Sequence, residues 1–477
     1  MRAILVFLAA LAVSSVVIGY EDPITMFQIE YPPDNSSVTL PLRFRFSIEA
    51  TRVEDFKERF GSAVICLELL GLSIECSPIL VPKIRFQDLP LGDYVARAYI
   101  YDGDVRYHET KPLSFSLVSA AEFEKQLERQ IEETRENHKF PPDLNILEWA
   151  MQSNESRSAG KLTADHDILS RDSSSTEVLL TIGVKTAVVD NFARRQAIRD
   201  TWASKVTLPA NVRVFFIGCM PNMAKIPSKR NRQRLRNAIA LERAVYGDLL
   251  TEELECEDSH FLLANKVSAF IEWVVAELPE TKFVMIADDD IYMRVRSIAR
   301  DLSTTVPQKR LYLGELSNGL HPSPLAPTRI PDDPYFTSER SYPLSQFVPY
   351  AAGPHFLLSI DCVQFIAQNR RRLASISGQD DTSIALWLLA IQVHVEETPA
   401  LASLRFSQCK NNVLSFADLS PLGIRFIHAN LLHNRTFCHG FELQIWEWRP
   451  LTTPSLAFGD QKTLHFYSTH SKVITVS

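Results

Sequence analysis

The sequence has no excess of basic residues. It contains 50 Lys and Arg against 57 Asp and Glu, which gives a formal net charge of -7 over 477 residues. Nucleic-acid binding depends on basic side chains that displace counterions from phosphates, so this balance argues against a nucleic-acid partner. A hydrophobic content of 45% with 22% charged residues is instead typical of a globular protein with a sizeable core, and the length predicts two or three domains.

Two short motifs are also missing. No two cysteines have C-x-x-C spacing, so the sequence does not indicate a structural zinc site. There is no G-x-G-x-x-G or G-K-[ST] loop, and the chain therefore does not bind phosphates through a glycine-rich backbone loop. A phosphate-bearing ligand would need another means of charge neutralisation, such as a divalent cation.

Long apolar runs are scarce, and the one that stands out lies at the N-terminus. Residues 3–20, AILVFLAALAVSSVVIGY, follow Met1 and Arg2 and contain no charged side chain. We predict a signal peptide, cleaved near Ser14 or Gly19, or an uncleaved signal anchor that associates with the membrane. No second run of comparable length follows, so we expect the rest of the chain in the lumen of the secretory pathway or outside the cell.

Three glycosylation sequons agree with this compartment, at Asn35, Asn154 and Asn434. Each lies in a polar, turn-rich segment that suits an exposed loop.

The seven cysteines point the same way. Cys66 and Cys76 flank an apolar, hairpin-like segment, and we predict that they pair; Cys409 with Cys438 is a second candidate pair. An odd count leaves at least one thiol free or paired elsewhere.

The pattern of short elements divides the chain. Residues 22–118 contain β-rich runs between Pro, Gly and Asp turns, and they predict a small β-sandwich of immunoglobulin-like type, with Tyr94 as its corner tyrosine. Its role is a spacer or a glycan-binding module. Residues 119–175 predict a connecting helix followed by a polar linker. Residues 176–440 alternate strands with helices, which predicts βαβ units around a mainly parallel sheet, and 441–477 form a C-terminal extension.

Three consecutive aspartates follow a buried strand of this second domain. The segment FVMIA at 283–287 runs directly into Asp288, Asp289 and Asp290. Ligands of such sheets bind beyond the carboxyl ends of the strands, where clustered carboxylates can hold a divalent cation. A helix cap or an exposed acidic turn is the alternative, and the run by itself leaves both readings open.

Two other charged segments belong to the same domain. Arg195 and Arg199 are four residues apart on a helix that follows the first strand, near the expected ligand crevice, although this segment by itself favours a solvated basic face. Asp380 and Asp381 begin an apolar helix. They are either helix-capping residues or include a general base for an acceptor hydroxyl.

The segments occur in a specific order. They read R-R-x-x-I-R-x-T-W (194–202), F-F-I-G (215–218), D-S-x-x-x-L-x-x-K (258–266), D-D-D (288–290), P-Y-A-x-G-P-x-F-x-L-S (349–359) and D-D-x-S-x-x-x-W (380–387). This ordered set resembles the β-1,3-galactosyltransferase and β-1,3-N-acetylglucosaminyltransferase family, glycosyltransferase family 31, which includes the Fringe proteins. The resemblance spans roughly residues 176–430.

The resemblance implies a glycosyltransferase A fold, a Rossmann-like mixed sheet flanked by helices, and an inverting mechanism with a UDP-sugar donor and Mn²⁺. It implies Asp381 as the catalytic base and Asp290 as the metal ligand, with His428 of RFIHANL completing the metal shell. It assigns the following residues to the substrate-binding side: Arg194, Arg195, Arg199, Asp288, Asp289, Gly353 and Asp380. Among these, Asp288 would contact the donor and Asp289 would support the turn.

The chain departs from the family pattern at several positions. Ile286 stands where relatives often carry lysine, His260 replaces a tyrosine, GPHF at 353–356 replaces a glycine-rich step, and D-D-T replaces E-D-V. Both presumed essential carboxylates remain. With no lysine at position 286, we predict that the carboxylates depend more strongly on the metal.

We therefore expect a metal-dependent hexosyltransferase of the Golgi lumen, membrane-anchored as a type II protein or luminal after cleavage. It would move galactose from UDP-galactose in β-1,3 linkage to a glycan or glycoprotein acceptor. A β-1,3-N-acetylglucosaminyltransferase that uses UDP-GlcNAc is the alternative within the class. A non-catalytic glycan-binding protein or chaperone on the same fold is the alternative outside it.

Overall fold

The computed structural model describes residues 22–51, 53–79, 82, 84–158, 177–304, 309–317, 326–331, 335–404, 409–441 and 443–446. The predicted signal segment and most of the predicted C-terminal extension lie outside these residues, as does the polar part of the predicted linker. Within the described part of the chain, no helix combines the length and apolar character needed to cross a membrane.

The described residues separate into two compact units. The first falls within 22–35, Leu42–Gln87 and Asp93–Ser116, and the second contains Ser36–Pro41, Asp88–Gly92 and the chain from Leu117 onward. Helices α2 (Ala120–His138) and α3 (Ile146–Ser158) therefore belong to the second unit, although the sequence predicted this region as a linker. They pack there against α10 and α5, respectively.

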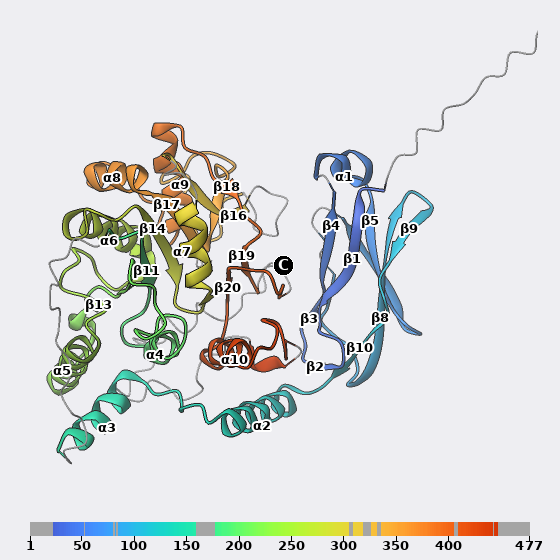
Figure 1. Ribbon diagram of the computed structural model, residues 1–477. Helices are drawn as coiled ribbons and strands as arrows, with labels where there is room; N and C mark the ends of the chain where they lie inside the picture. Colours follow the sequence, from blue (N-terminus) through green and yellow to red (C-terminus); the bar gives the residue numbers. More distant parts are fainter. Residues whose placement is uncertain are drawn as a thin grey trace, which may run out of the picture. The chain divides into compact units, whose positions relative to one another are not determined.

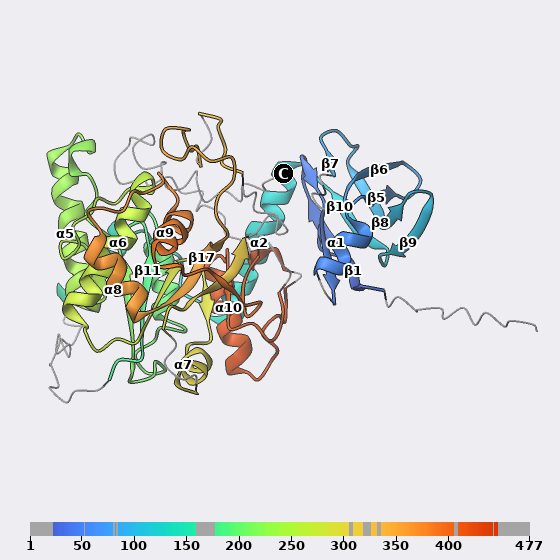
Figure 2. The same ribbon diagram turned by 90° about the horizontal axis from the view of Figure 1, so that it is seen from above.

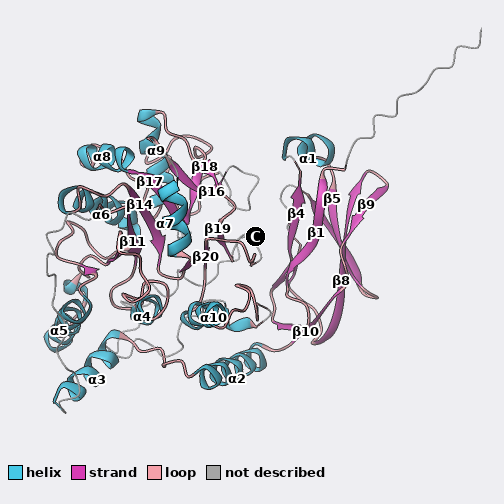
Figure 3. Cartoon of the chain, in the orientation of Figure 1, coloured by secondary structure: helices cyan, strands magenta, loops and turns pink. Residues whose placement is uncertain are grey.

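The first unit is built almost entirely of strands (Figure 3). Its elements are β1 (Ile24–Tyr31), β3 (Leu42–Arg43), β4 (Arg45–Ala50), α1 (Val53–Phe60), β5 (Val64–Leu69), β6 (Ser73–Pro78), β7 (Arg85–Phe86), β8 (Gly92–Asp102), β9 (Val105–Glu109) and β10 (Leu113–Leu117). Strand β8 is antiparallel to β5 and to β9, and β5 is antiparallel to β6. The β content agrees with the sequence, and the immunoglobulin-like assignment stays a prediction.

A seven-stranded mixed sheet forms the centre of the second unit (Figure 1). Its strands are β11 (Leu180–Lys185), β12 (Val212–Ile217), β13 (Leu249–Leu250), β14 (Phe283–Asp288), β16 (Tyr312–Ser317), β17 (Tyr350–Ser359) and β18 (Glu396–Glu397), in the spatial order β13-β12-β11-β14-β17-β16-β18. The first four in this order are parallel, and β17 runs antiparallel to β14 and β16. The start of β17 therefore meets the carboxyl ends of β11 and β14.

Helices cover both faces of this sheet (Figure 2). They are α4 (Phe192–Arg199), α5 (Lys229–Tyr246), α6 (Leu263–Glu277), α7 (Val295–Thr304), α8 (Ile360–Asn369), α9 (Asp380–Leu388) and α10 (Pro421–Leu432). Side chains alternate along a strand, so β14 places Met285 in one core, with α3, α4, α5, α7 and α10, and Ile286 in the other, with α6, α8 and α9. A small sheet of β15 (Tyr292–Met293), β20 (Ser415–Ala417) and β19 (Leu401–Ser403) lies beyond the end of β14.

Three disulfides connect the chain locally. Cys66–Cys76 and Cys409–Cys438 confirm the two predicted pairs, and Cys219 pairs with Cys256. The seventh cysteine, Cys362, is a free thiol buried on α8.

Candidate active site

The carboxyl ends of β11 and β14 carry the centre of the candidate site. Lys185 and Asp288 are the last residues of the two strands and are paired in the parallel register. Lys185 Nζ lies 3.0 Å from Asp288 Oδ1, 2.9 Å from Asp380 Oδ2 and 2.9 Å from the carbonyl oxygen of Gly353. One lysine thus brings together three residues that the sequence assigned to substrate binding from three separate segments.

Lys185 itself was missed by the sequence analysis, which noted the absence of a lysine at Ile286 and expected no neighbouring cation. That expectation is wrong, because the adjacent strand supplies the cation. Ile286 is fully buried in the core that contains α6, α8 and α9. Burial alone would lower the pKa of Lys185, but Asp288 and Asp380 outweigh burial and hold it above its usual value, so the ammonium stays charged. A charged residue at the end of an apolar strand was the signal that could have identified it.

The next two aspartates have different surroundings. Asp289 is buried, and its carboxylate accepts hydrogen bonds from Arg194 Nη1 at 2.7 Å and from Thr186 Oγ1 at 2.6 Å. Both oxygens accept hydrogen bonds from the protein, which agrees with the predicted role of Asp289 in supporting the turn. Asp290 Oδ2 lies 3.4 Å from the same Arg194 Nη1 and remains partly exposed.

Carboxyl groups cluster at this edge of the sheet. Burial raises the pKa of Asp290 to about 8, against the opposing effect of Arg194, and the neighbouring carboxylates of Asp288 and Asp418 raise it further. Burial also raises the pKa of Asp288 to about 6, with Lys185 opposing. Asp418 follows β20 and comes close because Leu419 N donates to the carbonyl oxygen of Asp290 at 2.8 Å. The sequence analysis missed Asp418.

The donor atoms in this region suit a hard divalent cation. Asp288, Asp290 and Asp418 offer carboxylate oxygens, which are the ligands that Mn²⁺ and Mg²⁺ prefer. Among the described residues, no three His, Cys, Asp or Glu side chains are arranged to hold a metal ion by themselves. Such a cation commonly takes one or two protein carboxylates and completes its shell with substrate phosphates and water, and the donor set fits that arrangement.

His428, predicted as a metal ligand, lies on α10. Its Nδ1 is 3.0 Å from Tyr292 Oη, and Tyr292 follows Asp290 by two residues. Burial lowers the pKa of His428, so its imidazole is neutral, the form that can bind a metal. The contact that the structure shows is the one to Tyr292, and the role of His428 as a ligand stays a prediction.

Asp381, the predicted base, lies in the first turn of α9. Its Oδ1 accepts a hydrogen bond from Thr382 N at 2.7 Å, and a Cβ on Gly353 would be 3.1 Å from its Oδ2. Glycine at position 353 therefore leaves room for this carboxylate. Burial raises the pKa of Asp381 to about 7 and Asp380 raises it further, while the Thr382 amide and Lys185 oppose the shift. A carboxylate with a pKa near neutrality can accept a proton from a hydroxyl.

Arg195 and Arg199 do not join this group. Arg195 is fully buried; it forms two hydrogen bonds of 2.8 Å with Glu242 and donates to the carbonyl oxygens of Ala187 and Val188. Arg199 is paired with Glu242 and Asp248. The prediction that these two arginines bind substrate needs correction, because their guanidinium groups are bonded within the protein and stabilise the β11–α4 connection.

The D-S-x-x-x-L-x-x-K motif supports the same connection. Lys266 Nζ donates to Asp258 Oδ1 and to the carbonyl oxygen of Thr186, both at 2.7 Å, and Asp258 Oδ2 accepts from Val188 N at 2.9 Å. The motif therefore fixes residues 186–188, which lie directly after Lys185.

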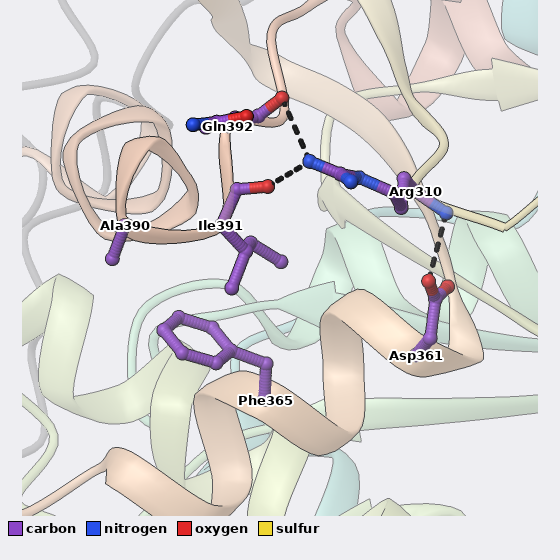
Figure 4. A pocket seen from close by; sticks show the side chains of 6 residues that line it. All are labelled: Arg310, Asp361, Phe365, Ala390, Ile391 and Gln392. Carbon is purple, nitrogen blue, oxygen red and sulfur yellow. Dashed lines mark hydrogen bonds between the residues drawn. The ribbon is translucent and has the colours of Figure 1, made fainter.

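A pocket is present at the other end of β17. It is lined by Arg310, Asp361, Phe365, Ala390, Ile391 and Gln392 (Figure 4). Arg310 N donates to Asp361 Oδ2 at 2.8 Å, and the guanidinium group donates to the carbonyl oxygens of Ile391 and Gln392. Asp361 lies two residues after the end of β17, whereas Gly353 is near its start, so this pocket is separate from the carboxylates described above.

Comparison with known proteins places this unit in a family. The galactosyltransferase family model matches residues 193–399, a range that contains Asp288, Asp290, Gly353 and Asp381. The chain carries a galactosyltransferase-family domain. This match supports the family predicted from the ordered motifs, glycosyltransferase family 31.

Several curated glycosyltransferases are similar to this chain. Hydroxyproline O-galactosyltransferase GALT2 of Arabidopsis thaliana is 26% identical over 271 residues, which are 56% of this chain and 36% of the relative. Mouse beta-1,3-galactosyltransferase 6 is 30% identical over 221 residues, 45% of this chain and 64% of the relative. A human acetylgalactosaminyl-O-glycosyl-glycoprotein beta-1,3-N-acetylglucosaminyltransferase is 29% identical over 184 residues, 38% and 45% of the respective chains. The matches thus cover one third to two thirds of these relatives.

Among solved structures, mouse xyloside xylosyltransferase 1 in its apo form is similar over 51% of this chain, with 10% sequence identity and a TM-score of 0.26. A score this low supports no argument about fold or function.

Proposed function

We propose that this protein is an inverting, metal-dependent β-1,3-galactosyltransferase of the secretory pathway that uses UDP-galactose. One observation carries the proposal: within a galactosyltransferase-family domain, Lys185 joins the carboxylate of Asp288 to the helix that begins with Asp380 and Asp381. A cluster of carboxyl groups that suits a donor and a cation thus lies next to a carboxyl group that can act as a base. The mixed sheet with helices on both faces supports assignment to the glycosyltransferase A fold.

In the proposed reaction, Asp381 accepts the proton of the acceptor hydroxyl while the hydroxyl oxygen attacks the anomeric carbon. The bond between that carbon and the UDP oxygen breaks on the opposite face, so the configuration inverts in one displacement. Asp288 is placed to bind the donor, and Asp289 holds the turn through Arg194 and Thr186. Asp290, with Asp288 and Asp418 beside it, would hold Mn²⁺, which supplies charge neutralisation for the UDP leaving group.

The direct test is transfer and hydrolysis of UDP-galactose by the purified full-length protein with Mn²⁺, compared with Asp290→Ala. We expect turnover by the wild type and a loss of at least about 100-fold in the variant, because a charge-stabilising interaction made in the transition state is removed. If the wild type turns over no UDP-sugar and shows no metal-dependent binding of UDP, the enzyme assignment fails. Binding of glycan without turnover would instead favour the non-catalytic alternative.

The donor is a separate question, because the relatives include both galactosyltransferases and N-acetylglucosaminyltransferases. We propose UDP-galactose as the donor and a glycan or glycoprotein as the acceptor. Parallel measurements of kcat/KM for UDP-galactose and UDP-GlcNAc with a panel of sugar acceptors decide between the two. A higher kcat/KM for UDP-GlcNAc would change the proposed activity to that of a β-1,3-N-acetylglucosaminyltransferase.

The proposed compartment is the lumen of the Golgi apparatus. Three disulfides are consistent with an oxidising compartment. Localisation of the tagged full-length protein, with glycosidase treatment to detect modification of the sequons, tests this part of the proposal.

A further inference from the structure

Lys185 has an unusually complete set of partners for a buried lysine. An ammonium group has three N–H donors, and the three acceptors around Lys185 Nζ lie at 2.9, 2.9 and 3.0 Å. They belong to three elements: Gly353 to β17, Asp380 to α9 and Asp288 to β14. Lys185 is only 5% exposed, so water does not compete appreciably for these bonds. The ammonium group therefore fixes three elements relative to one another at a single point.

The position of Asp381 depends on the same three elements. Asp381 follows Asp380 in the first turn of α9, and its Oδ2 lies against the open side of Gly353. Lys185 thus contacts Asp380, which precedes the candidate base, and Gly353, against which the base packs. The third contact of Lys185 is with Asp288, on the donor side of the candidate site.

We infer that Lys185 is a positioning residue that holds the candidate base Asp381 at a fixed distance from the donor-side carboxylate Asp288. This inference rests on the proposed function. Lys185 does not exchange a proton with substrate; it acts by locating the first turn of α9 against the ends of β14 and β17. Loss of this contact would leave both groups present but misaligned.

Lys266 provides a matched control. It is also a buried lysine, and it also contacts one aspartate and one backbone carbonyl, at 2.7 Å each. Its contacts end on Asp258 and on Thr186, and none of them reaches α9. Neutralising either lysine removes a buried ion pair and lowers stability, so a difference between the two variants at α9 reports on the contacts of Lys185 with α9 and not on the general cost of a lost charge.

The experiment compares wild type, Lys185→Met and Lys266→Met in the full-length protein with UDP-galactose and Mn²⁺. Active sites are counted by the stoichiometry of UDP binding, so that kcat refers to folded protein. For Lys185→Met we expect UDP affinity within about threefold of wild type and a kcat lower by about 100-fold, the scale expected for misplacement of reacting groups by about 1 Å. A kcat per UDP site equal to that of the wild type would overturn the inference.

Hydrogen exchange of the first turn of α9 supplies a readout independent of activity. The amides of Thr382 and Ser383 donate to Asp381 Oδ1 and to the carbonyl oxygen of Gln379. We expect these amides to exchange at least about tenfold faster in Lys185→Met, and to keep wild-type protection in Lys266→Met, because local opening becomes easier when a tether is lost. Unchanged protection in Lys185→Met contradicts the inference.

The two readouts separate this inference from the proposed function. A wild-type protein without turnover of any UDP-sugar defeats the proposed function, and the exchange data then decide alone whether Lys185 positions α9. If Lys185→Met does not fold, Asp380→Asn is the second variant, since it removes the charged partner on α9 and leaves Lys185 with Asp288 and Gly353. The same fall in kcat and the same loss of protection are expected, and normal values for both would refute the inference.

Discussion

We propose different tasks for the aspartates of this site because their immediate surroundings differ. Asp289 is held by two donors and is buried, whereas Asp288 is paired with a buried ammonium and is partly open. Asp381 accepts a backbone amide, and burial raises its pKa to about 7. Sequence alone treats these residues as similar acids, whereas their neighbouring groups differ in the way that the proposed roles of binding, support and proton acceptance require.

The raised pKa of Asp381 predicts opposite effects of one substitution on stability and activity. The folded protein binds the Asp381 proton more tightly than the unfolded chain, whose ordinary pKa is 3.8, so stability is lost as pH rises from about 4 to about 7. Asp381→Asn should therefore raise the thermal midpoint at pH 8, leave it nearly unchanged below pH 4, and abolish transfer while UDP still binds. Transfer by the wild type should rise with pH up to about 7.

Thermal unfolding between pH 4 and pH 8 and the pH profile of kcat/KM check these expectations. An Asn variant that is less stable than wild type at pH 8 would contradict the first, and transfer at the wild-type rate would remove Asp381 as the base.

Arg195 is predicted to be a stability residue. Arg195→Met leaves Glu242 buried with one of its two arginine partners missing, and breaking a buried ion pair costs about 3–5 kcal/mol. We expect this loss of stability in chemical denaturation. The UDP affinity per folded molecule should stay within about threefold of wild type, because the guanidinium group of Arg195 does not reach the ligand side of the candidate site. Arg371→Met, at a side chain that is 82% exposed, is the control and should change stability by less than about 0.5 kcal/mol. A loss of UDP binding without a loss of stability would restore the original substrate-binding assignment.

The residues that the sequence analysis identified differ from those that it missed in how far along the chain their determining partners lie. Asp288 and Asp380 were identifiable because they lie in local runs of aspartate, and Gly353 was identified through the resemblance of the ordered motifs to a known family. Lys185 and Asp418 were not, because their importance arises from strand register and from a chain crossing more than 100 residues away. Arg195 was misassigned because its partner Glu242, 47 residues further on, lies on a helix that the sequence analysis did not consider.

At the level of elements, the close approach of β11 and α6 depends on a missing side chain. A Cβ on Gly183 would lie 2.3 Å from Phe270 Cε1, well inside contact distance. Gly183 stands two residues before Lys185 on the same strand, so any shift of β11 away from α6 also moves the candidate site.

Gly183→Ala is accordingly expected to destabilise the protein by about 1–3 kcal/mol through overpacking. Adding Phe270→Leu removes the ring atoms that the new methyl group would meet, and it should recover part of this loss, although Phe270→Leu alone should be destabilising. Denaturation of the two single variants and the double variant measures the coupling. If the destabilisation of the double variant equals the sum of the losses in the two single variants, the clash with Phe270 is not the cause of the loss in Gly183→Ala.

Element prediction succeeded where apolar periodicity was strong. Strands β11 and β14 and helix α4 were predicted, and the structure confirms them. Helix α5 was not, because its sequence is rich in arginine and buries few side chains, chiefly Leu235, Ala238, Ile239 and Glu242. Packing against α3 and β13 stabilises it, and such contacts are not visible in a local window.

At the scale of the whole molecule, each unit has its own core and its own cross-links. The disulfide Cys219–Cys256 closes a separation of 37 residues just after β12. Replacing both cysteines by serine should lower the free energy of unfolding by about 2–4 kcal/mol, since the unfolded chain regains the entropy of an open loop. Guanidinium titration of the double variant measures this loss, and the Cys66/Cys76 double variant is the comparison. Equal stability of wild type and the Cys219/Cys256 variant would show that the bond contributes nothing.

The order of the cysteines has a consequence for biosynthesis. The three disulfides join residues 10, 37 and 29 positions apart, and none of their loops contains a cysteine of another pair. When such a chain enters an oxidising compartment from its N-terminus, the first cysteine of each pair meets its native partner as the next cysteine to arrive. Cys362 is the exception because it has no disulfide partner. Cys362 emerges between the second and third pairs, ahead of Cys409, and burial in the α8 core is what removes its thiol from competition. In such a compartment, correct pairing of Cys409 with Cys438 would therefore require that α8 packs before this last pair is oxidised.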